Sequence, residues 1–549
     1  MKLLFKKNAL VKTFSLLNHL LTQQHIHFQI FLNHLEIKVH LDSMFNELNF
    51  LMVNFFFSEL PIFISIIFEL YLNEIYTMKI FFTFLFYILF QLGFAQSAET
   101  YFEKIRNNEA ALTAFFAQMP KGGDLHHHYS GSIYAEPLLA HAIAKDFYLN
   151  TQTMTVSQEK QSGNDWILFS TLKKNGELDT YKQKIMQKWS AKDYNNVDYP
   201  SDKLFFESFM KFEPATKNNF EAGLLELKNR AIKENVSYIE TQLSTIPSDI
   251  KTDDLAKYNT HLRKMAETKN EKAIMQSLDS LYTIFNQKEA KKYAADFNTN
   301  FVAKMHKELK IDDSQFTMRY QNFVLRFMEP VDLFKNLVVA FISADSSPLM
   351  AGVNIVSPED GETSMKDYWL HMVMFKYCHS RFPKVKYTMH AGELTLGLVR
   401  PEELSWHINA AVYTAGANRI GHGVDIAYEE KSYDLMRYMA KNNIPIEINL
   451  TSNEFILKVK ENRHPILLYK EFGVPIVIST DDAGILRTNM TEQYVLLAKR
   501  YKAISYTDIK QFVYNSINYS FIQDPAVKKQ LIQDLDNKFK TFEANFPVK

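Results

Sequence analysis

The sequence predicts an α/β protein whose main domain is a TIM-like (β/α)8 barrel, with an N-terminal helical extension and an insertion after the first βα unit. Short runs rich in β-branched and aromatic residues alternate with helical stretches, and eight such runs follow residue 120. Polar residues come directly after several of them. Because right-handed crossovers keep turning the same way, eight parallel strands in series close into a barrel with its functional side chains at the strand ends.

The predicted strands are short and are separated by helical patterns. They are residues 124–128, 236–243, 322–328, 349–356, 384–390, 419–422, 444–450 and 474–480. Helices that connect the later strands are predicted at 366–379, 400–414, 430–441, 465–472 and 491–547. The runs 444–450 and 474–480 are crowded with aliphatic residues, which suits strands buried on both faces of a parallel sheet.

Two segments are expected outside the repeat. Residues 96–119 form the N-terminal helical extension, with a helical pattern over 99–119 that Pro120 ends, and 120–549 form the barrel domain. Residues 149–200 are polar and rich in turn signals, with helical character only near 182–188. We interpret them as an insertion that covers or flanks the site; an ordinary surface excursion is the alternative.

Residues 78–95 have the pattern of a signal peptide. Lys79 is followed by an apolar run from Ile80 to Phe90 and by small residues before a cleavage site after Ala95. The run is short for a membrane-spanning helix, which favours cleavage over an anchor. Residues 1–77 are interpreted as a non-native or disordered upstream segment, with a membrane-associated extension as the alternative. The expected location is therefore secreted or periplasmic, with membrane attachment only if residues 1–95 are retained.

Composition excludes several classes of protein. Lys+Arg and Asp+Glu are both 62, so the formal net charge is zero, and this balance argues against nucleic acid as a partner. The chain has one cysteine, Cys378, which excludes an internal disulfide and a cysteine-based zinc site.

Histidines and carboxylates gather where predicted strands end. His126 and His128 are spaced i, i+2, so both side chains of an extended chain reach the same face. His390 ends a strand, and His422 lies between two glycines at the end of another. The sequence Ser479-Thr-Asp-Asp-Ala-Gly484 follows the last strand and supplies two adjacent carboxylates. Each feature alone has an ordinary reading, as a surface histidine, a buried histidine or a solvated turn, but together they indicate one site.

This set of residue types predicts metal-assisted hydrolysis. Neutral imidazoles with a carboxylate and a water are suitable ligands for a borderline-soft dication such as Zn²⁺. A zinc-bound water has a pKa near 7 rather than about 15.7 and becomes a usable nucleophile. A further histidine and a protonated Glu393 could then transfer protons.

Four motifs resemble those of the zinc-dependent adenosine deaminases of the metal-dependent amidohydrolase superfamily. They are Pro120-Lys-Gly-Gly-Asp-Leu-His-His-His128, Met389-His-Ala-Gly-Glu393, Arg419-Ile-Gly-His-Gly423 and Ser479-Thr-Asp-Asp482, in the order of the family. The second motif and the export signal resemble the secreted growth-factor-like branch and its bacterial relatives. Members of that branch are often dimers, which makes a homodimer conceivable, with helix 99–119 as a candidate contact.

The resemblance implies a role for each site residue. One Zn²⁺ per chain would be held by His126, His128, His390 and Asp481, and the catalytic residues would be Glu393, His422 and Asp481. Glu393 would protonate the purine N1, zinc hydroxide would attack C6, and Asp482 would bind N7. Gly392, Ser130 and Ser357 complete the expected substrate contacts. The implied reaction converts adenosine, and 2′-deoxyadenosine, to inosine and ammonia.

Two departures from the family pattern concern the substrate. Ser130 stands where an aspartate usually contacts the ribose, and Ser357 stands where a glycine usually reaches N3. Nothing resembles a phosphate cradle, which disfavours AMP. The alternatives are a related amidohydrolase for another aminated purine or ring, and a barrel kept for binding or signalling without turnover. A purine nucleoside is therefore the expected small-molecule partner.

Overall fold

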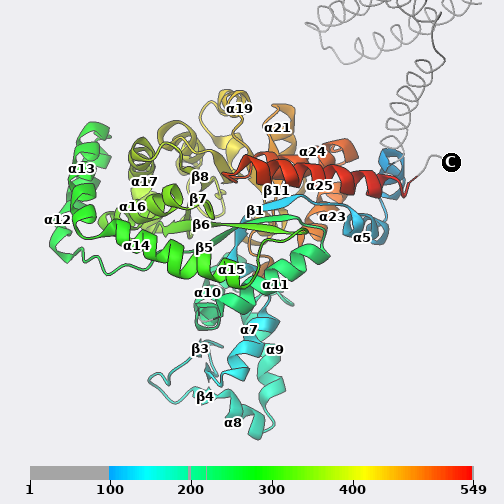
Figure 1. Ribbon diagram of the computed structural model, residues 1–549, viewed down its shortest axis with the longest axis horizontal. Coiled ribbons are helices and arrows are strands. Elements are labelled where there is room, and N and C mark those ends of the chain that lie inside the picture. Colours follow the sequence, from blue (N-terminus) through cyan, green and yellow to red (C-terminus); the bar gives the residue numbers. More distant parts are fainter. Residues whose placement is uncertain (1–97, 196–198, 218, 547–549) are drawn as a thin grey trace, which may run out of the picture. The chain divides into compact units, whose positions relative to one another are not determined.

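A computed structural model describes residues 98–195, 199–217 and 219–546 of the chain. Eight parallel strands form one sheet in the order β1-β5-β6-β7-β8-β9-β10-β11, and helices surround it (Figure 1). The strands are β1 (Gly123–His128), β5 (Tyr238–Ser244), β6 (Thr317–Leu325), β7 (Met350–Val356), β8 (Lys386–Ala391), β9 (Arg419–His422), β10 (Ile446–Ile448) and β11 (Ile476–Ile478). The predicted TIM-like (β/α)8 fold is confirmed.

The barrel closes between its first and last strands through a single residue pair. His127 and Asp481 form an isolated parallel bridge. The N–H of Asp481 donates to the carbonyl of His126 at 2.9 Å, and the N–H of His128 donates to the carbonyl of Asp481 at 3.3 Å. The seam of the barrel is therefore made by the segments that carry predicted site residues.

Three strands differ from their predicted bounds by at least two residues at both ends. β6 begins at Thr317 rather than 322, because its polar residues Arg319 and Gln321 are buried with partners inside the protein. β10 and β11 are shorter than predicted: each is preceded by a proline, Pro445 or Pro475, which has no N–H for the ladder.

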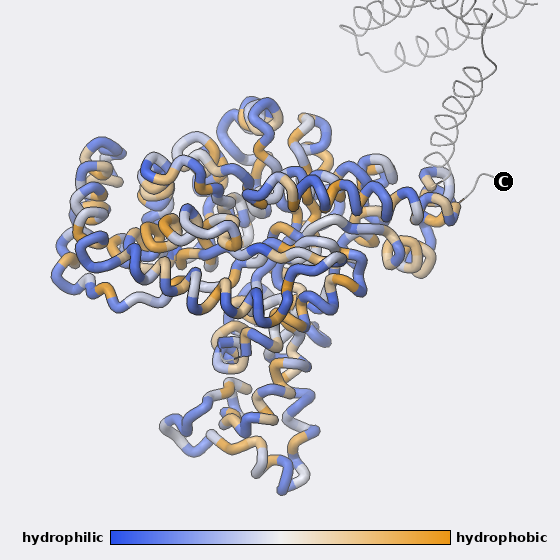
Figure 2. The backbone as a smooth tube through the Cα atoms, in the orientation of Figure 1, coloured by the Kyte–Doolittle hydropathy of each residue, from blue (hydrophilic) through white to orange (hydrophobic). Residues whose placement is uncertain are grey.

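The helices that follow the first strands of the barrel differ in length. They are α6 (Tyr129–Ser132), α7 (Ala135–Ala144), α10 (Ser201–Lys217), α11 (Phe220–Lys233), α12 (Lys257–Glu267), α13 (Glu271–Gln287), α14 (Ala290–Asp296), a π-helical turn (Phe297–Ala303), α15 (Lys304–Glu308), α16 (Pro330–Ser346) and α17 (Glu362–Arg381). Those of the second half are α18 (His407–Asn409), α19 (Ser432–Lys441), α20 (Leu450–Leu457), α21 (Ile466–Glu471), α22 (Ala483–Leu486), α23 (Met490–Arg500), α24 (Tyr506–Asn518) and α25 (Pro525–Glu543). Hydrophilic and hydrophobic residues alternate along the outer helices (Figure 2), as in α25, which buries Leu531, Leu535, Phe539 and Phe542 on one face.

The predicted helices 491–547 and 400–414 are each broken. The first is three helices, because Ser505 and Asp508 form a capping box that starts α24, and Asp524 caps α25 just before Pro525. The second is a 3₁₀ turn (Pro401–Ser405), α18 and a π-helical turn (Ala410–Ala415).

The N-terminal extension is helical and packs against the end of the chain. The predicted helix 99–119 is interrupted, because the Asn108 side chain accepts from the N–H of Ala111 and starts a new helix, α5 (Glu109–Gln118). Within α5, Phe116 stacks on Tyr494 of α23 with ring centroids 5.8 Å apart, and Phe115 meets Phe542 of α25 at 5.0 Å. Its apolar face is therefore part of the core.

The stretch predicted as an insertion forms a small sheet of its own in the lower part of Figure 1. β2 (Tyr148–Asn150) pairs antiparallel with β3 (Val156–Ser157) and β4 (Trp166–Leu168), and the helices α8 (Phe169–Lys174) and α9 (Leu178–Trp189) follow. The Trp189 indole donates to the carbonyl of Met154 at 2.8 Å and ties α9 to this sheet.

The N-terminal predictions, 1–77 and 78–95, lie outside the described residues. Within the described part of the chain, no helix combines the length and the apolar character that a membrane crossing requires.

Candidate active site and metal centre

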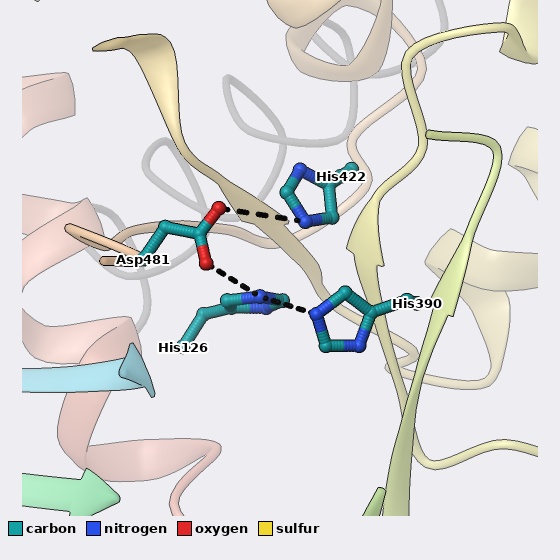
Figure 3. Close-up of side chains that lie close together, drawn as sticks. All are labelled: His126, His390, His422 and Asp481. Carbon is teal, nitrogen blue, oxygen red and sulfur yellow. Dashed lines mark hydrogen bonds and ion pairs between the residues drawn. The ribbon is translucent and has the colours of Figure 1, made fainter. Parts of the chain in front are cut away.

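Four predicted metal ligands converge at the carboxyl ends of the strands. The Nε2 atoms of His126 and His390 are 3.0 Å apart, and those of His390 and His128 are 3.3 Å apart. Asp481 Oδ1 lies 3.2 Å from His128 Nε2 and 3.6 Å from His126 Nε2. Figure 3 shows His126, His390, His422 and Asp481 turned toward one common point.

The hydrogen bonds of His126 and His390 determine which ring nitrogen of each histidine is free to bind a metal. His126 Nδ1 lies 2.7 Å from Glu447 Oε2, which can only accept, and His390 Nδ1 lies 3.1 Å from Asn354 Oδ1, which also accepts from the N–H of Ile355. Both Nδ1 atoms therefore donate, and both Nε2 atoms present lone pairs. Two lone pairs 3.0 Å apart need a proton or a metal cation between them, and with His128 and Asp481 the donor set fits zinc.

A chain of hydrogen bonds gives His422 a different role. The N–H of Ile466 donates to His464 Nδ1 at 3.2 Å, so the proton of the neutral His464 ring is on Nε2, which lies 3.0 Å from Asn453 Oδ1. The Asn453 amide N–H then donates to His422 Nδ1 at 3.0 Å, which leaves the His422 proton on Nε2. That N–H faces Asp481 Oδ2 at 3.8 Å and Glu393 Oε1 at 3.7 Å. Burial lowers the pKa of His422 to about 3, so the ring is neutral. With its proton on Nε2, His422 offers the cluster a hydrogen-bond donor and not a lone pair, although its ring lies within the group of possible metal-binding side chains.

The backbone at two site residues is in the left-handed region. His422 has φ +67° and Asp481 has φ +62°, conformations that cost a non-glycine residue about 1–3 kcal/mol. His422 is the last residue of β9, and Asp481 follows the end of β11. Gly421 has a related function, because a Cβ there would lie 2.7 Å from Cε1 of His126. The motif around His422 is therefore shaped to admit the His126 ring.

Buried charged side chains fix the orientation of the predicted metal ligand His126. Arg419 donates to Glu447 and to Glu240, and Thr388 donates to Glu447 at 3.0 Å. Burial alone would raise the pKa of Glu447, but Arg419 and His126 together lower it to about 2. Glu447 is therefore an ionised acceptor that fixes the orientation of His126.

Glu393 is held at the edge of the cluster by a second buried carboxylate. The backbone N–H groups of Gly392 and Glu393 both donate to Glu359, at 3.1 and 2.9 Å, and His407 Nδ1 lies 2.6 Å from the same carboxylate. Burial first, and then the negative charges of Asp481 and Glu359, raise the pKa of Glu393 well above its usual range. The Glu393 carboxyl group is thus set up to carry a proton.

Asp482 follows the predicted metal ligand Asp481, and the predicted substrate contacts Ser130, Ser357 and Gly392 lie in α6, after β7 and after β8. Burial and the adjacent Asp481 raise the pKa of Asp482, and its Oδ1 is buried without a hydrogen-bond partner in the described part of the chain. A Cβ on Gly131 would lie 1.7 Å from that oxygen, so the glycine is required there. Ser130 is half-buried in α6, and Ser357 follows β7 with φ +90°. The N–H of Gly392 is already used by Glu359.

A cavity of about 340 Å³ opens beside Glu393. Its wall includes parts of α10, the loop after β7 and the end of α20, with the apolar side chains of Phe206, Leu398 and Ile456. Its other carboxylates are those of Asp202, Glu359 and Asp360, against one lysine, Lys203. The entrance to the site is therefore acidic.

Sequence reasoning missed the residues that hold the site in place. Glu447 acts on His126 from β10, Asn354 acts on His390 from β7, and Glu359 acts on Glu393 from the loop after β7. The Arg419 motif was noticed without a role for the arginine. Glu447 did leave a signal, because a carboxylate in the middle of the aliphatic run 444–450 is costly to bury without a partner.

Comparison with known proteins finds similarity to adenosine deaminases. The family model for adenosine deaminase matches residues 316–538, which include His390, Glu393, His422 and Asp481. The adenosine deaminase of Clostridium kluyveri is 32% identical over 162 residues, 29% of this chain and 43% of that protein. That of Aliivibrio fischeri strain MJ11 is 33% identical over 155 residues, 28% of this chain and 42% of that protein. The matched region thus spans less than half the length of these relatives.

Solved structures share the fold. The crystal structure of an Arabidopsis N6-mAMP deaminase has a TM-score of 0.50 and 18% sequence identity, and the match covers 77% of this chain and 99% of that one. The likeness reaches beyond residues 316–538 and includes most of the described barrel.

Proposed function

We propose that the chain is an adenosine deaminase that hydrolyses adenosine, and 2′-deoxyadenosine, to inosine and ammonia with one zinc ion per chain. The observation that carries the proposal is the convergence of the three Nε2 atoms and Asp481 Oδ1 next to Glu393. A binding protein has no need of both a ligand set and groups that move protons, which argues against a barrel without turnover.

His126, His128, His390 and Asp481 would hold the zinc ion, as their free nitrogens and oxygen suggest. When bound, zinc lowers the pKa of a coordinated water to about 7 and so supplies a nucleophile at neutral pH. His422 presents its Nε2–H toward Asp481 and Glu393, where it can orient that water by a hydrogen bond. We propose zinc because three histidine nitrogens and one carboxylate oxygen are suitable ligands for it.

Glu393 and Asp482 would act on the purine ring. A protonated Glu393 can donate to N1, which makes C6 more electrophilic, and the proton later needed by the leaving ammonia can pass through the same carboxyl group. Asp482, also held protonated by its surroundings, can donate to N7. Two neutral carboxylic acids, both donors, match the two acceptor nitrogens on either side of C6.

The acidic entrance supports a nucleoside rather than a nucleotide as substrate. Asp202, Glu359 and Asp360 outnumber Lys203 around the cavity beside Glu393, and a phosphate dianion entering it would meet like charge. The Arabidopsis structure of similar fold is that of an enzyme for a methylated nucleotide, so AMP and N6-methyl-AMP are the informative competitors.

A substrate panel on the full chain tests the proposal. Adenosine, 2′-deoxyadenosine, adenine, AMP and N6-methyl-AMP are followed by absorbance, and zinc is measured by elemental analysis. We expect turnover of the two nucleosides and about one zinc per chain. Turnover of a nucleotide or of the free base, with no reaction of either nucleoside, would identify the protein as a related amidohydrolase with another substrate. Deamination by metal-free protein would contradict the metal mechanism.

We also propose that the protein is exported and that it forms a homodimer. The sequence of residues 78–95 motivates secretion or periplasmic location, and the resemblance motivates a homodimer. N-terminal sequencing of the exported protein, expected to begin near Gln96, and its mass in solution test the two.

A further inference from the structure

A second cavity, of about 820 Å³, lies at the other end of the barrel. Its wall includes Lys384 and Lys386 at the start of β8, Asn418 just before β9 and Asn443 shortly before β10, together with residues 518–523 between α24 and α25. His390 and His422 of the candidate active site lie at the carboxyl ends of β8 and β9. We call this feature the amino-terminal cavity.

Lysines and amides outnumber carboxylates among the polar groups of this cavity. Lys384 and Lys386 are spaced i, i+2, are both exposed, and have no ion-pair or hydrogen-bond partner anywhere in the described ranges. Lys528 also lines the cavity, with its ammonium donating to the carbonyls of Asn518 and Ser520 at 3.1 and 2.9 Å. Asp345 is the single carboxylate among the lining residues.

Two of the lining asparagines, Asn418 and Asn443, use only their amide oxygens in side-chain hydrogen bonds. Asn418 Oδ1 accepts from the N–H of Tyr387 at 3.1 Å, and Asn443 Oδ1 accepts from the hydroxyl of Tyr519 at 3.3 Å. A backbone N–H can only donate, so the oxygen of Asn418 must face it and the amide N–H₂ is left over. Neither of the two amide nitrogens has an acceptor among the residues that the structure describes.

The cavity also offers apolar surface and a rigid floor. Tyr438, Tyr519 and Phe521 contribute aromatic rings to its wall. Phe521 is fixed from inside the barrel, because its N–H donates to Glu240 at 2.8 Å and the Arg419 guanidinium lies 3.6 Å from its ring centroid. Arg419 also donates to the carbonyl of Tyr519 at 3.0 Å. A ligand here would contact a preformed surface, and the volume exceeds what an inorganic anion needs.

We propose that the amino-terminal cavity binds a small organic phosphate. The two unpaired ammonium groups and the two free amide N–H₂ groups are donors for the oxygens of a phosphate group, which only accept. The aromatic side chains of the wall can pack against a ring attached to that phosphate. The site is opposite in character to the acidic entrance beside Glu393, so one chain would admit a neutral nucleoside at one end and a phosphate ester at the other.

Calorimetry on the full chain tests this site with UMP, a pyrimidine nucleotide that has no exocyclic amino group to be hydrolysed. We expect UMP to bind the wild-type chain and uridine to bind at least tenfold more weakly. The double variant Lys384→Gln/Lys386→Gln should weaken UMP binding at least tenfold. Lys529→Gln is the matched control, because Lys529 is an exposed lysine next to Lys528 that does not line the cavity.

Three outcomes would overturn the proposal. They are no UMP binding at millimolar concentration, equal affinity of the wild type and the double variant, and equal affinity for UMP and uridine. Inorganic phosphate forms a separate arm: affinity equal to that of UMP would make free phosphate the ligand, and weaker affinity supports the phosphate ester. Melting temperatures verify that the variants are folded. The heat of binding does not depend on turnover, so this test and that of the proposed deaminase activity fail independently.

Discussion

At the scale of single residues, the site works by controlling which atom carries a proton. Glu393 is the clearest case, because burial and two neighbouring carboxylates keep its carboxyl group protonated. Replacement by glutamine keeps the shape but cannot deliver a proton. We expect Glu393→Gln to retain about one zinc per chain and to lose roughly 10²–10⁴-fold in kcat. Glu430→Gln, at an exposed glutamate, is the control, and a Glu393→Gln rate near that of the wild type would remove Glu393 as proton donor.

The tautomer of His422 gives a second prediction at this scale. The Asn453 amide donates to His422 Nδ1, and His464 fixes the orientation of that amide. In Asn453→Asp a carboxylate would accept instead of donate and would draw the His422 proton to Nδ1. We expect kcat to fall about 10–100-fold with zinc retained, the usual effect of losing such a supporting partner.

Nitrogen-15 NMR of the His422 ring reports the tautomer directly and would not respond to a merely structural change. If the ring proton of the wild type were on Nδ1, the hydrogen-bond chain from Ile466 to His422 would be assigned in the wrong direction. An Asn453→Asp variant with unchanged kcat and a shifted proton would show that the His422 N–H has no part in turnover.

At the scale of elements, the loop after β8 depends on one carboxylate from the loop after β7. Glu359 accepts from the N–H groups of Gly392 and Glu393 and from His407, and it lies 3.7 Å from Arg326 Nη1. In Glu359→Gln an amide N–H₂ would face a backbone N–H inside the protein. We expect a loss of about 1–3 kcal/mol in the free energy of unfolding, measured with denaturant, and a lower kcat with zinc retained.

The pH dependence of stability gives an independent measurement on the same residue. Burial opposes ionisation of Glu359, but His407 and Arg326 outweigh it and leave its pKa below the ordinary value. Its contribution is therefore present above the pKa of the unfolded chain, about 4.3, and is lost as the pH falls through the folded value. Glu359→Gln should lose less stability in acid than the wild type does. If the free energy of unfolding fell equally with decreasing pH in the two proteins, a role for this charge would be contradicted.

At the scale of the whole molecule, the barrel was predictable because its signal is periodic. Eight aliphatic runs with helices between them are visible whatever their exact ends, and ligands such as His126 and His390 are visible because polar residues directly after a buried strand are costly without a purpose. β6 was placed late because Arg319 and Gln321 look like surface residues until their buried partners are known. Glu359 and Asn354 were missed for a related reason: each matters only through a residue on the neighbouring strand, and one sequence does not show that adjacency.

The position of the metal ligands at the barrel seam has a consequence for stability. β1 and β11 meet only through the bridge between His127 and Asp481, whereas most neighbouring strands pair over several residues. His126 and His128 come from one side of this seam, Asp481 from the other, and His390 from the opposite wall. A zinc ion bound to all four would connect the two edges of the sheet where the hydrogen bonding between them is weakest.

Removing the metal should therefore lower the melting temperature as well as the activity. A ligand present at 100 times its Kd stabilises the folded state by about 2.7 kcal/mol, which for a chain of this size corresponds to a shift of a few degrees. We expect chelation to produce that shift and added zinc to reverse it. Asp481→Asn, which weakens the ligand on the β11 side, should melt lower from the start and respond less to the chelator. If chelation left the melting temperature of the wild type unchanged, the seam would be closed by the backbone alone. The four side chains would then stabilise the site without stabilising the barrel.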